Sequence, residues 1–503
     1  MNISNKFRNN QELLITIVIV CGIIALVNFF ASQFFWRLDL TRDQRYSIST
    51  TTKETVRQLE DLVTVKLYFS EDLPNQYSLV KQQVIDILQD YQGYGSNFKY
   101  EIINPGTGEE ADKAGIPKIQ FNEIKQDKFQ VGTGYMGMVI NYQDKNEIIP
   151  LIEDTKTLEY QLTAIIMKLS AKEPLVLGLV QSHGVPSIDS ELKIFHQELS
   201  KLYQVKLVDL KTKKIDDTIK TLVIIGLKEN LSKDELEVVD RFLMSGKAVL
   251  ILQDGVNIYS EPVHVAIANQ SNFLDYPAKY GIKINKDLVS DLNSGLATFN
   301  QGFFNINIDY YLWPKISKDQ LDSSNSSMSQ LDSLILPWAS SLSLDKSLMP
   351  NANYSELIRS SNHAWTQTEK FNLDPNAQVL SPDKKSYLMA VKLTGELKSP
   401  YSNSQTTEGK LIVVGNSNFI KSDFINGNQN NLLFAQNLID SVTLNADLSN
   451  IRSKNISSNS ITPITEPEKQ TLRYLNVFGI TVLVFVYGMS RYYFRKKSKT
   501  LAL

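Results

Sequence analysis

Two long apolar segments near the ends of the chain constrain its fold most strongly. The first runs from Leu13 to Phe35 without a charged residue, long enough to cross a bilayer with some tilt. It is longer than the apolar part of a signal peptide and lacks a clear cleavage site, so it indicates an uncleaved anchor. The second, from Tyr474 to Ser490, is short, and a buried core helix is the alternative. Tyrosines at its two ends and a basic run after it favour a membrane span over residues 472–491.

The basic residues after the second segment predict the orientation. They favour a cytoplasmic tail at 492–503 under the positive-inside rule: Arg491, Arg495, Lys496, Lys497 and Lys499. Two spans put both termini on one side, so residues 1–12 are expected in the cytoplasm, although basic residues at 37–45 weaken that signal. The chain between the spans is then expected in the periplasm of a bacterium, outside the cytoplasmic (inner) membrane.

Composition excludes several classes of protein. A content of 42 % hydrophobic and 21 % charged residues is typical of a folded chain, and a net charge of −2 argues against nucleic-acid binding. Cys21 is the only cysteine, which excludes an internal disulfide, a redox pair and a cysteine-rich zinc site. The four histidines are scattered without metal-ligand spacing. We therefore predict neither a metal nor another cofactor.

The segment after the first span predicts a small α/β domain. A connector over 36–61 contains Thr51 and Glu54 at capping-box spacing. Residues 62–171 then alternate between strand-like and helical patterns in the order β-α-β-α-β-β-α. This order is typical of a thioredoxin-like domain, here without the redox cysteines, and the fold alone does not give a function.

Residues 172–448 predict a second α/β domain. Near-continuous apolar runs alternate with helical patterns, as in a doubly wound, mostly parallel sheet. Ser232 and Glu235 form a capping box at the start of one helix. Residues 255–405 are rich in Ser and Asn and predict irregular insertions, with a flexible surface loop at 322–333. A linker over 449–471 leads to the second span.

Polar residues follow several of the predicted strands, at the edge where open α/β sheets bind ligands. The candidate contact residues are Gln181, Ser182, His183, Gly184, Asp254, Asn416, Ser417 and Asn418. His183 allows three interpretations: a structural turn with an exposed side chain, a ligand or partner contact, or a catalytic group. A serine adjacent to a histidine is weak evidence for catalysis, so we favour the turn. The other residues could equally cap the turns that follow their strands.

The landmarks in their order resemble the GldG-like proteins, the auxiliary component of gliding-motility-type ABC transporters. The matching stretches are "DLTRDQRYSIS", "VKLYFSEDLP", "GYMGMVINYQDKNEIIPLI", "LEYQLTAIIMKL", "LIVVGNSNFI" and the last helix with its basic tail. "QSHG" stands where that family has a Gly-His-Gly-Glu-like turn, although Val185 replaces the acidic residue. Residues 255–405 contribute little to the resemblance.

This resemblance implies a non-enzymatic, membrane-anchored auxiliary subunit. Its partners would be a multispan ABC-2-type permease and a cytoplasmic ABC ATPase on separate chains, since this chain has no P-loop and too few spans for a permease. An alternative is an extracytoplasmic sensor that binds a saccharide, a peptide or another cell-envelope ligand. A hydrolase is the third interpretation, disfavoured because no G-x-S-x-G motif occurs.

Overall fold

In the computed structural model, the described part of the chain is residues 47–444, apart from short gaps, together with a few residues near each end. The gaps are 72, 107, 126–127, 156, 260–264, 302–303, 323–327, 329–330, 332 and 378–379, and the end residues are 19, 20, 22, 23, 487–489 and 491. Both predicted spans, the linker and the basic tail lie almost wholly outside this part. Among the described residues, no helix has the length and apolar character needed to cross a bilayer.

The first unit is a four-stranded sheet with helices on both faces. Its elements are α2 (Thr50–Arg57), β1 (Val63–Phe69), α3 (Asn75–Tyr94), β2 (Phe98–Ile103), α4 (Glu109–Lys113), β3 (Ile119–Lys125), β4 (Lys128–Gly134), β5 (Met136–Tyr142), β6 (Lys145–Ile149) and α5 (Leu158–Ser170). The strand order is β2-β1-β5-β6, with β2 parallel and β5 antiparallel to β1. Apolar residues of α2, α3 and α5 pack on one face, and Ala111 of α4 packs on the other.

Two local features of this unit differ from the sequence prediction. Helix α2 is capped by Ser49, whose hydroxyl accepts from the Thr52 amide, rather than through Thr51 and Glu54. Strands β3 and β4 form a separate hairpin that is absent from the predicted order. The remaining helices and strands confirm the predicted β-α-β-α-β-β-α order, with this hairpin inserted before β5.

The second unit is built around a nine-stranded sheet. Its parallel strands and main helices are β7 (Val176–Val180), α6 (Lys193–Ser200), β8 (Gln204–Val208), β9 (Thr221–Ile225), α7 (Lys233–Met244), β10 (Ala248–Leu252), β22 (Gln405–Val414), α10 (Ser422–Gly427) and α11 (Gln429–Thr443). Strands β8, β7, β9, β10 and β22 lie side by side and are mutually parallel. Strands β7, β9 and β10 are buried along their whole length, as expected for strands covered on both faces.

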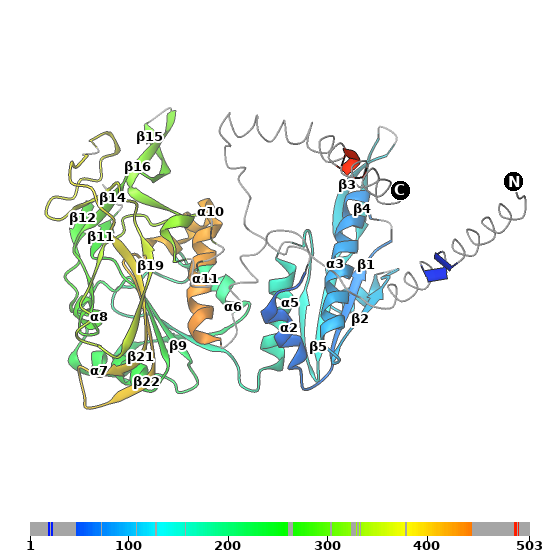
Figure 1. Cartoon of the computed structure of the whole chain (residues 1–503), viewed down its shortest axis with the longest axis horizontal. Coiled ribbons are helices and arrows are strands. Elements are labelled where there is room, and N and C mark those ends of the chain that lie inside the picture. The colour runs from blue at the N-terminus through cyan, green and yellow to red at the C-terminus, as the bar shows by residue number, and fades with distance from the viewer. Residues whose placement is uncertain are drawn as a thin grey trace, which may run out of the picture. The chain divides into compact units, whose positions relative to one another are not determined.

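Helices cover both faces of this sheet, which confirms a mixed α/β unit. Apolar side chains of α6 and α11 pack on one face, and those of α7 and α8 (Asp275–Ala278) pack on the other. Figure 1 shows α6 and α11 on the opposite side of the strands from α7 and α8. The alternating side chains of the central strands supply both cores.

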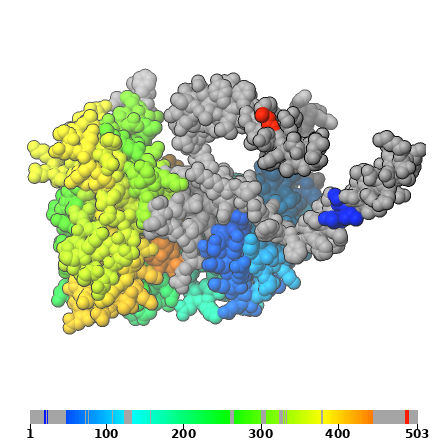
Figure 2. All heavy atoms as spheres, in the orientation of Figure 1, coloured from blue at the N-terminus to red at the C-terminus, as the bar shows by residue number. Residues whose placement is uncertain are grey.

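The segment 255–405 is not irregular, which corrects the sequence prediction. It contains β11 (Val256–Tyr259), β12 (Val265–Ala268), β13 (Ile282–Ile284), β14 (Leu288–Asp291), β15 (Ser294–Gln301), β16 (Phe304–Ser317), β17 (Ser333–Ile335), β18 (Leu342–Leu344), β19 (Ala352–Arg359), β20 (Ala364–Gln367) and β21 (Leu388–Lys398). Strands β13, β18, β19 and β21 extend the main sheet with antiparallel pairings. Some of its short strands pair with distant partners, as β13 does with β18 and β14 with β20, whereas β11–β12 and β15–β16 are local hairpins. The short apolar pieces carry too little local period to reveal either kind of strand. Figure 2 shows this green-to-yellow segment over much of the visible face of the unit.

The predicted loop at 322–333 falls largely outside the described residues. Met328 and Leu331, the two that are described between Asp322 and Ser333, have fully buried side chains in the core that also holds α11. The Ser-rich composition of this segment therefore does not prevent single apolar side chains within it from being buried in the core.

Candidate functional site

The predicted site residues lie at the carboxyl edge of the parallel strands. Gln181–Gly184 follow β7, Asp254 follows β10, and Asn416–Asn418 follow β22. The chain runs from β7 outward to β8 and then crosses back to β9 on the other side of β7. This reversal between β7 and β9 is the position at which open α/β sheets usually form a ligand crevice.

Backbone hydrogen bonds join the loops that follow β7 and β9, between which the chain reverses direction across the sheet. His183 and Gly184 both have left-handed backbone conformations, with φ of 63° and 72°. The turn that they form directs the His183 carbonyl toward the loop after β9, where it accepts from the amides of Lys228 (3.1 Å) and Glu229 (3.2 Å). A Cβ on Gly184 would also lie 3.3 Å from Lys228 Cβ. The β7 and β9 loops are therefore joined directly to each other.

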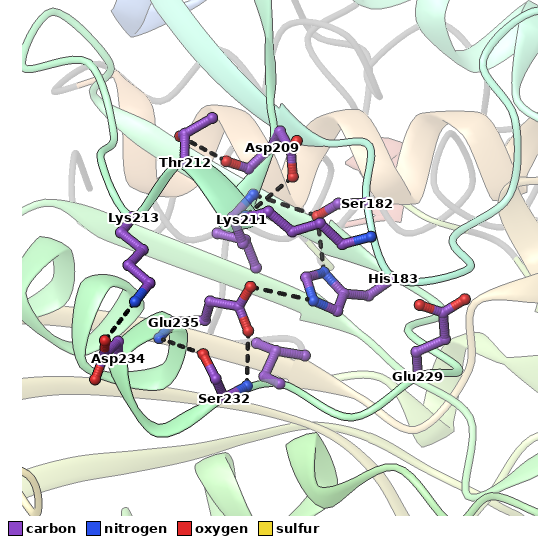
Figure 3. A network of polar contacts seen from close by, with 12 residues as sticks. Ser182, His183, Asp209, Lys211, Thr212, Lys213, Glu229, Ser232, Asp234 and Glu235 are labelled. Carbon is purple, nitrogen blue, oxygen red and sulfur yellow. Dashed lines mark hydrogen bonds and ion pairs between the residues drawn. The ribbon is translucent and has the colours of Figure 1, made fainter.

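The His183 side chain is buried and links three segments, as Figure 3 shows. Its Nδ1 lies 2.9 Å from Ser182 Oγ, and its Nε2 lies 3.4 Å from Glu235 Oε1. With a proton on Nε2 the ring faces the Glu235 carboxylate with a donor, and in that tautomer Nδ1 accepts from the Ser182 hydroxyl. Ser182 Oγ in turn accepts from the Leu210 amide after β8, at 3.3 Å.

This arrangement corrects the expectation of an exposed turn side chain. The side chain of His183 is only 4 % exposed, because the left-handed turn folds it over the first turn of α7. The spacing of Ser232 and Glu235 predicts a capping box but carries no sign of the contact with His183. Glu235 and His183 are far apart in sequence, and only the crossover from β9 into α7 brings them together.

Glu235 is held as a carboxylate by the start of its own helix. Its Oε2 accepts from the Ser232 amide at 2.6 Å, and its amide donates to Ser232 Oγ at 3.4 Å, so the predicted capping box is confirmed. Burial alone would raise the pKa of Glu235. The hydrogen bonds from Ser232 and the proximity of His183 outweigh burial and lower that pKa below its ordinary value.

The buried carboxylate of Asp254 accepts hydrogen bonds from the residues that follow β22. Its Oδ1 accepts from the Ser417 amide (2.8 Å) and the amide groups of Asn418 (3.2 Å) and Asn416 (3.4 Å). Its Oδ2 accepts from the Ser417 hydroxyl. Burial raises the pKa of Asp254, although the two bonds from Ser417 partly offset the rise. The structure thus brings together four of the predicted site residues.

A second layer of polar residues, which sequence reasoning missed, fills the same edge. Gln253 binds both backbone groups of Leu227, through Oε1 (2.9 Å) and Nε2 (3.0 Å). Asn269 Nδ2 donates to the Asp254 carbonyl at 3.0 Å, and Ser340 Oγ accepts from the Gly255 amide at 3.0 Å. Gln253 directly precedes Asp254, so its position beside the site was a usable signal. Asn269 and Ser340 come from the segment 255–405 and carried no local signal.

The residues around His183 and the residues around Asp254 approach each other at Gly226. A Cβ on this glycine would lie 2.8 Å from Ser417 Oγ and 3.4 Å from Pro186 Cδ, so the β7 and β22 loops approach its bare backbone. No hydrogen bond or ion pair between described residues joins the His183 side chain to Asp254. Two separate networks therefore fill the edge, and the polar atoms within each network are hydrogen-bonded to one another.

The network around His183 places three groups in a row. Ser182, His183 and Glu235 follow one another as hydroxyl, imidazole and carboxylate, the order of a hydrolase relay. Ser182 Oγ also accepts from the Leu210 amide, and the imidazole is buried. Among the described residues, no cluster of His, Cys, Asp and Glu is arranged to hold a metal ion. The chemistry of this edge is that of a packed, hydrogen-bonded closure.

A nine-stranded α/β sheet with a closed carboxyl edge, preceded by a smaller α/β unit, defines the class of protein. Comparison with known families matches residues 175–449 to the ABC-type uncharacterized transport system family. This match covers more than half of the chain, and the chain belongs to that family. Residues 42–141 match a domain of unknown function.

Individual relatives add context. An uncharacterized protein of Borreliella burgdorferi is 23 % identical over 512 residues, covering 98 % of this chain and all of that protein. Among solved structures, the N-terminal domain of mmIFT52 aligns with 53 % of this chain and 97 % of its own, at 14 % identity and a TM-score of 0.36.

Proposed function

We propose that this chain is a membrane-anchored, non-enzymatic auxiliary subunit of a gliding-motility-type ABC transporter. The family match over residues 175–449 carries the proposal, because that family is described as an ABC-type uncharacterized transport system. The closed strand edge supports a non-enzymatic role, since its serine, histidine and carboxylate groups are engaged with one another. The candidate residues from Gln181 to Gly184 then act by joining loops and not by binding a ligand.

The proposed architecture has two membrane helices, over 13–35 and 472–491, with residues 62–171 and 172–448 between them as periplasmic domains. The uncharged stretches 13–35 and 474–490 and the basic tail support this arrangement. We propose that residues 62–171 form a thioredoxin-like domain without redox chemistry. The order β2-β1-β5-β6, with β1 and β2 parallel, supports this assignment.

The proposed partners are a multispan ABC-2-type permease and an ABC ATPase on separate chains. A tag placed after Leu503 and extraction of native membranes with a mild detergent test this partnership. We expect a permease and an ATPase to be recovered together with the tagged chain. A control with the tag on a version lacking residues 472–503 should lose both partners. Recovery of the intact chain alone would instead favour the sensor interpretation.

A further inference from the structure

An open cavity of about 440 Å³ lies in the antiparallel part of the nine-stranded sheet. It adjoins the closed strand edge through Ser340, whose Oγ donates to the Asp287 carbonyl at 2.7 Å. Its walls come from the residues after β13, from β18, from the end of β19 and from the residues before β21. The volume falls in the range of pockets that bind small molecules. Its charged lining residues are Asp287, Glu356, Arg359 and Lys385.

One wall of the cavity carries a buried carboxylate without a counter-charge. Asp287 is 5 % exposed, and it accepts from the Ser341 amide (2.8 Å) and the Ser341 hydroxyl (2.6 Å). Both donors are neutral, and no described lysine, arginine or histidine lies within ion-pair distance of this carboxylate. Burying an unpaired charge is unfavourable, and in the free protein the burial raises the pKa of Asp287.

The hydroxyl groups beside Asp287 are held in fixed positions. Asn285 Nδ2 donates to Ser341 Oγ and to Ser343 Oγ, each at 2.9 Å. This wall therefore presents a preorganised set of oxygen acceptors around the carboxylate, and little side-chain ordering is needed when a donor arrives.

The other wall carries a free ammonium group. The Lys385 side chain is exposed, its Nζ lies 5.2 Å from the centre of the Tyr387 ring, and no described carboxylate is within 4 Å of it. Arg359 differs, because Glu356 Oε2 accepts from its Nε at 2.8 Å and lies 2.7 Å from its Nη2. After this internal pairing, the cavity retains one buried carboxylate and one cation.

We propose that this cavity binds a small zwitterion of the amino-acid or dipeptide class, with its ammonium on Asp287 and its carboxylate on Lys385. Such a ligand supplies the counter-charge that Asp287 lacks and forms charge-assisted hydrogen bonds at both ends. A neutral saccharide of similar size would leave both charges uncompensated. The proposal goes beyond the auxiliary role proposed above and does not depend on it.

The test is calorimetric titration of the full-length chain in detergent. The probes are L-alanine, D-alanine and L-alanyl-L-alanine, with propionate, ethylamine and glucose as matched compounds. We expect at least one of the three zwitterions to bind. The three matched compounds should bind at least about tenfold more weakly, because each lacks one or both charges. Absence of zwitterion binding, or equal binding of glucose, would overturn the proposal.

Two variants assign the binding to this cavity. Lys385→Gln should weaken zwitterion affinity about tenfold, whereas Lys384→Gln, at an exposed position outside the cavity lining, should leave it unchanged. Asp287→Asn keeps the shape of the side chain and should likewise weaken zwitterion affinity by about tenfold or more, with thermal melting used to confirm that the variant folds. Unchanged affinity in Lys385→Gln would refute the assignment. Because ligand binding and co-purification with a permease are measured separately, either proposal can fail without the other.

Discussion

At the scale of single residues, His183 has the most unusual environment at the strand edge. It combines a left-handed backbone, a buried ring and contacts to Ser182 and Glu235. Its carbonyl also joins the β7 and β9 loops. The backbone contacts would survive replacement of the side chain, whereas the contact with Glu235 would not. Replacing the His183 side chain therefore tests the contribution of its contacts with Ser182 and Glu235 while leaving the backbone contacts in place.

We predict that His183→Ala destabilises the nine-stranded unit by about 1–3 kcal/mol, because Glu235 and Ser182 lose a buried partner. Unfolding by urea, followed through tryptophan fluorescence, measures this change, since Trp313, Trp338 and Trp365 all lie in that unit. His363→Ala is the matched control, at an exposed side chain, and should stay within about 0.5 kcal/mol of the native chain. Native-like stability of His183→Ala would mean that the ring is dispensable to the edge.

At the scale of elements, the start of α7 anchors the edge. The capping box of Ser232 and Glu235 satisfies amides at the helix N-terminus, and the same carboxylate faces His183. The helix is thereby attached to the β7 loop through one side chain. Its stability should consequently depend on the ionisation of Glu235.

The pKa of Glu235 is lowered on folding, so its carboxylate stabilises the fold at pH values above its ordinary pKa of 4.5. That stabilisation is lost as the pH falls below 4.5 and through the lower folded value. Glu235→Gln should therefore be less stable than the native chain at about pH 7, with a difference that shrinks toward about pH 4. Urea unfolding at several pH values measures the trend. Glu237→Gln, on the same helix, should show no comparable convergence, and a constant difference for Glu235→Gln would argue against an ionised capping box.

At the scale of the whole molecule, the proposed topology makes the clearest prediction. A reporter enzyme that is active only outside the cytoplasm should work when inserted at Ser326 and fail when fused after Leu503. The basic tail is the physical reason, because positively charged residues next to a span are retained in the cytoplasm. A cytoplasmic reporter should give the opposite result at both sites. Activity of the first reporter after Leu503 would reverse the proposed orientation.

Local sequence alone determined the elements whose signals are local. The buried strands β7, β9 and β10 follow from continuous apolar runs, and the start of α7 follows from Ser232 and Glu235 three positions apart. The position of the polar residues at the carboxyl edge also follows, because it depends only on where each strand ends.

Tertiary structure alone decided which of those polar residues meet and whether they remain accessible. Asp254 contacts Ser417 across 163 positions of sequence, and His183 meets Glu235 only because the chain crosses from β9 into α7. Several strands of residues 255–405 likewise pair with distant partners, as β14 does with β20 and β13 with β18. Such contacts depend on the summed packing of many segments, and the short apolar and polar pieces that form them have no period of their own to reveal them.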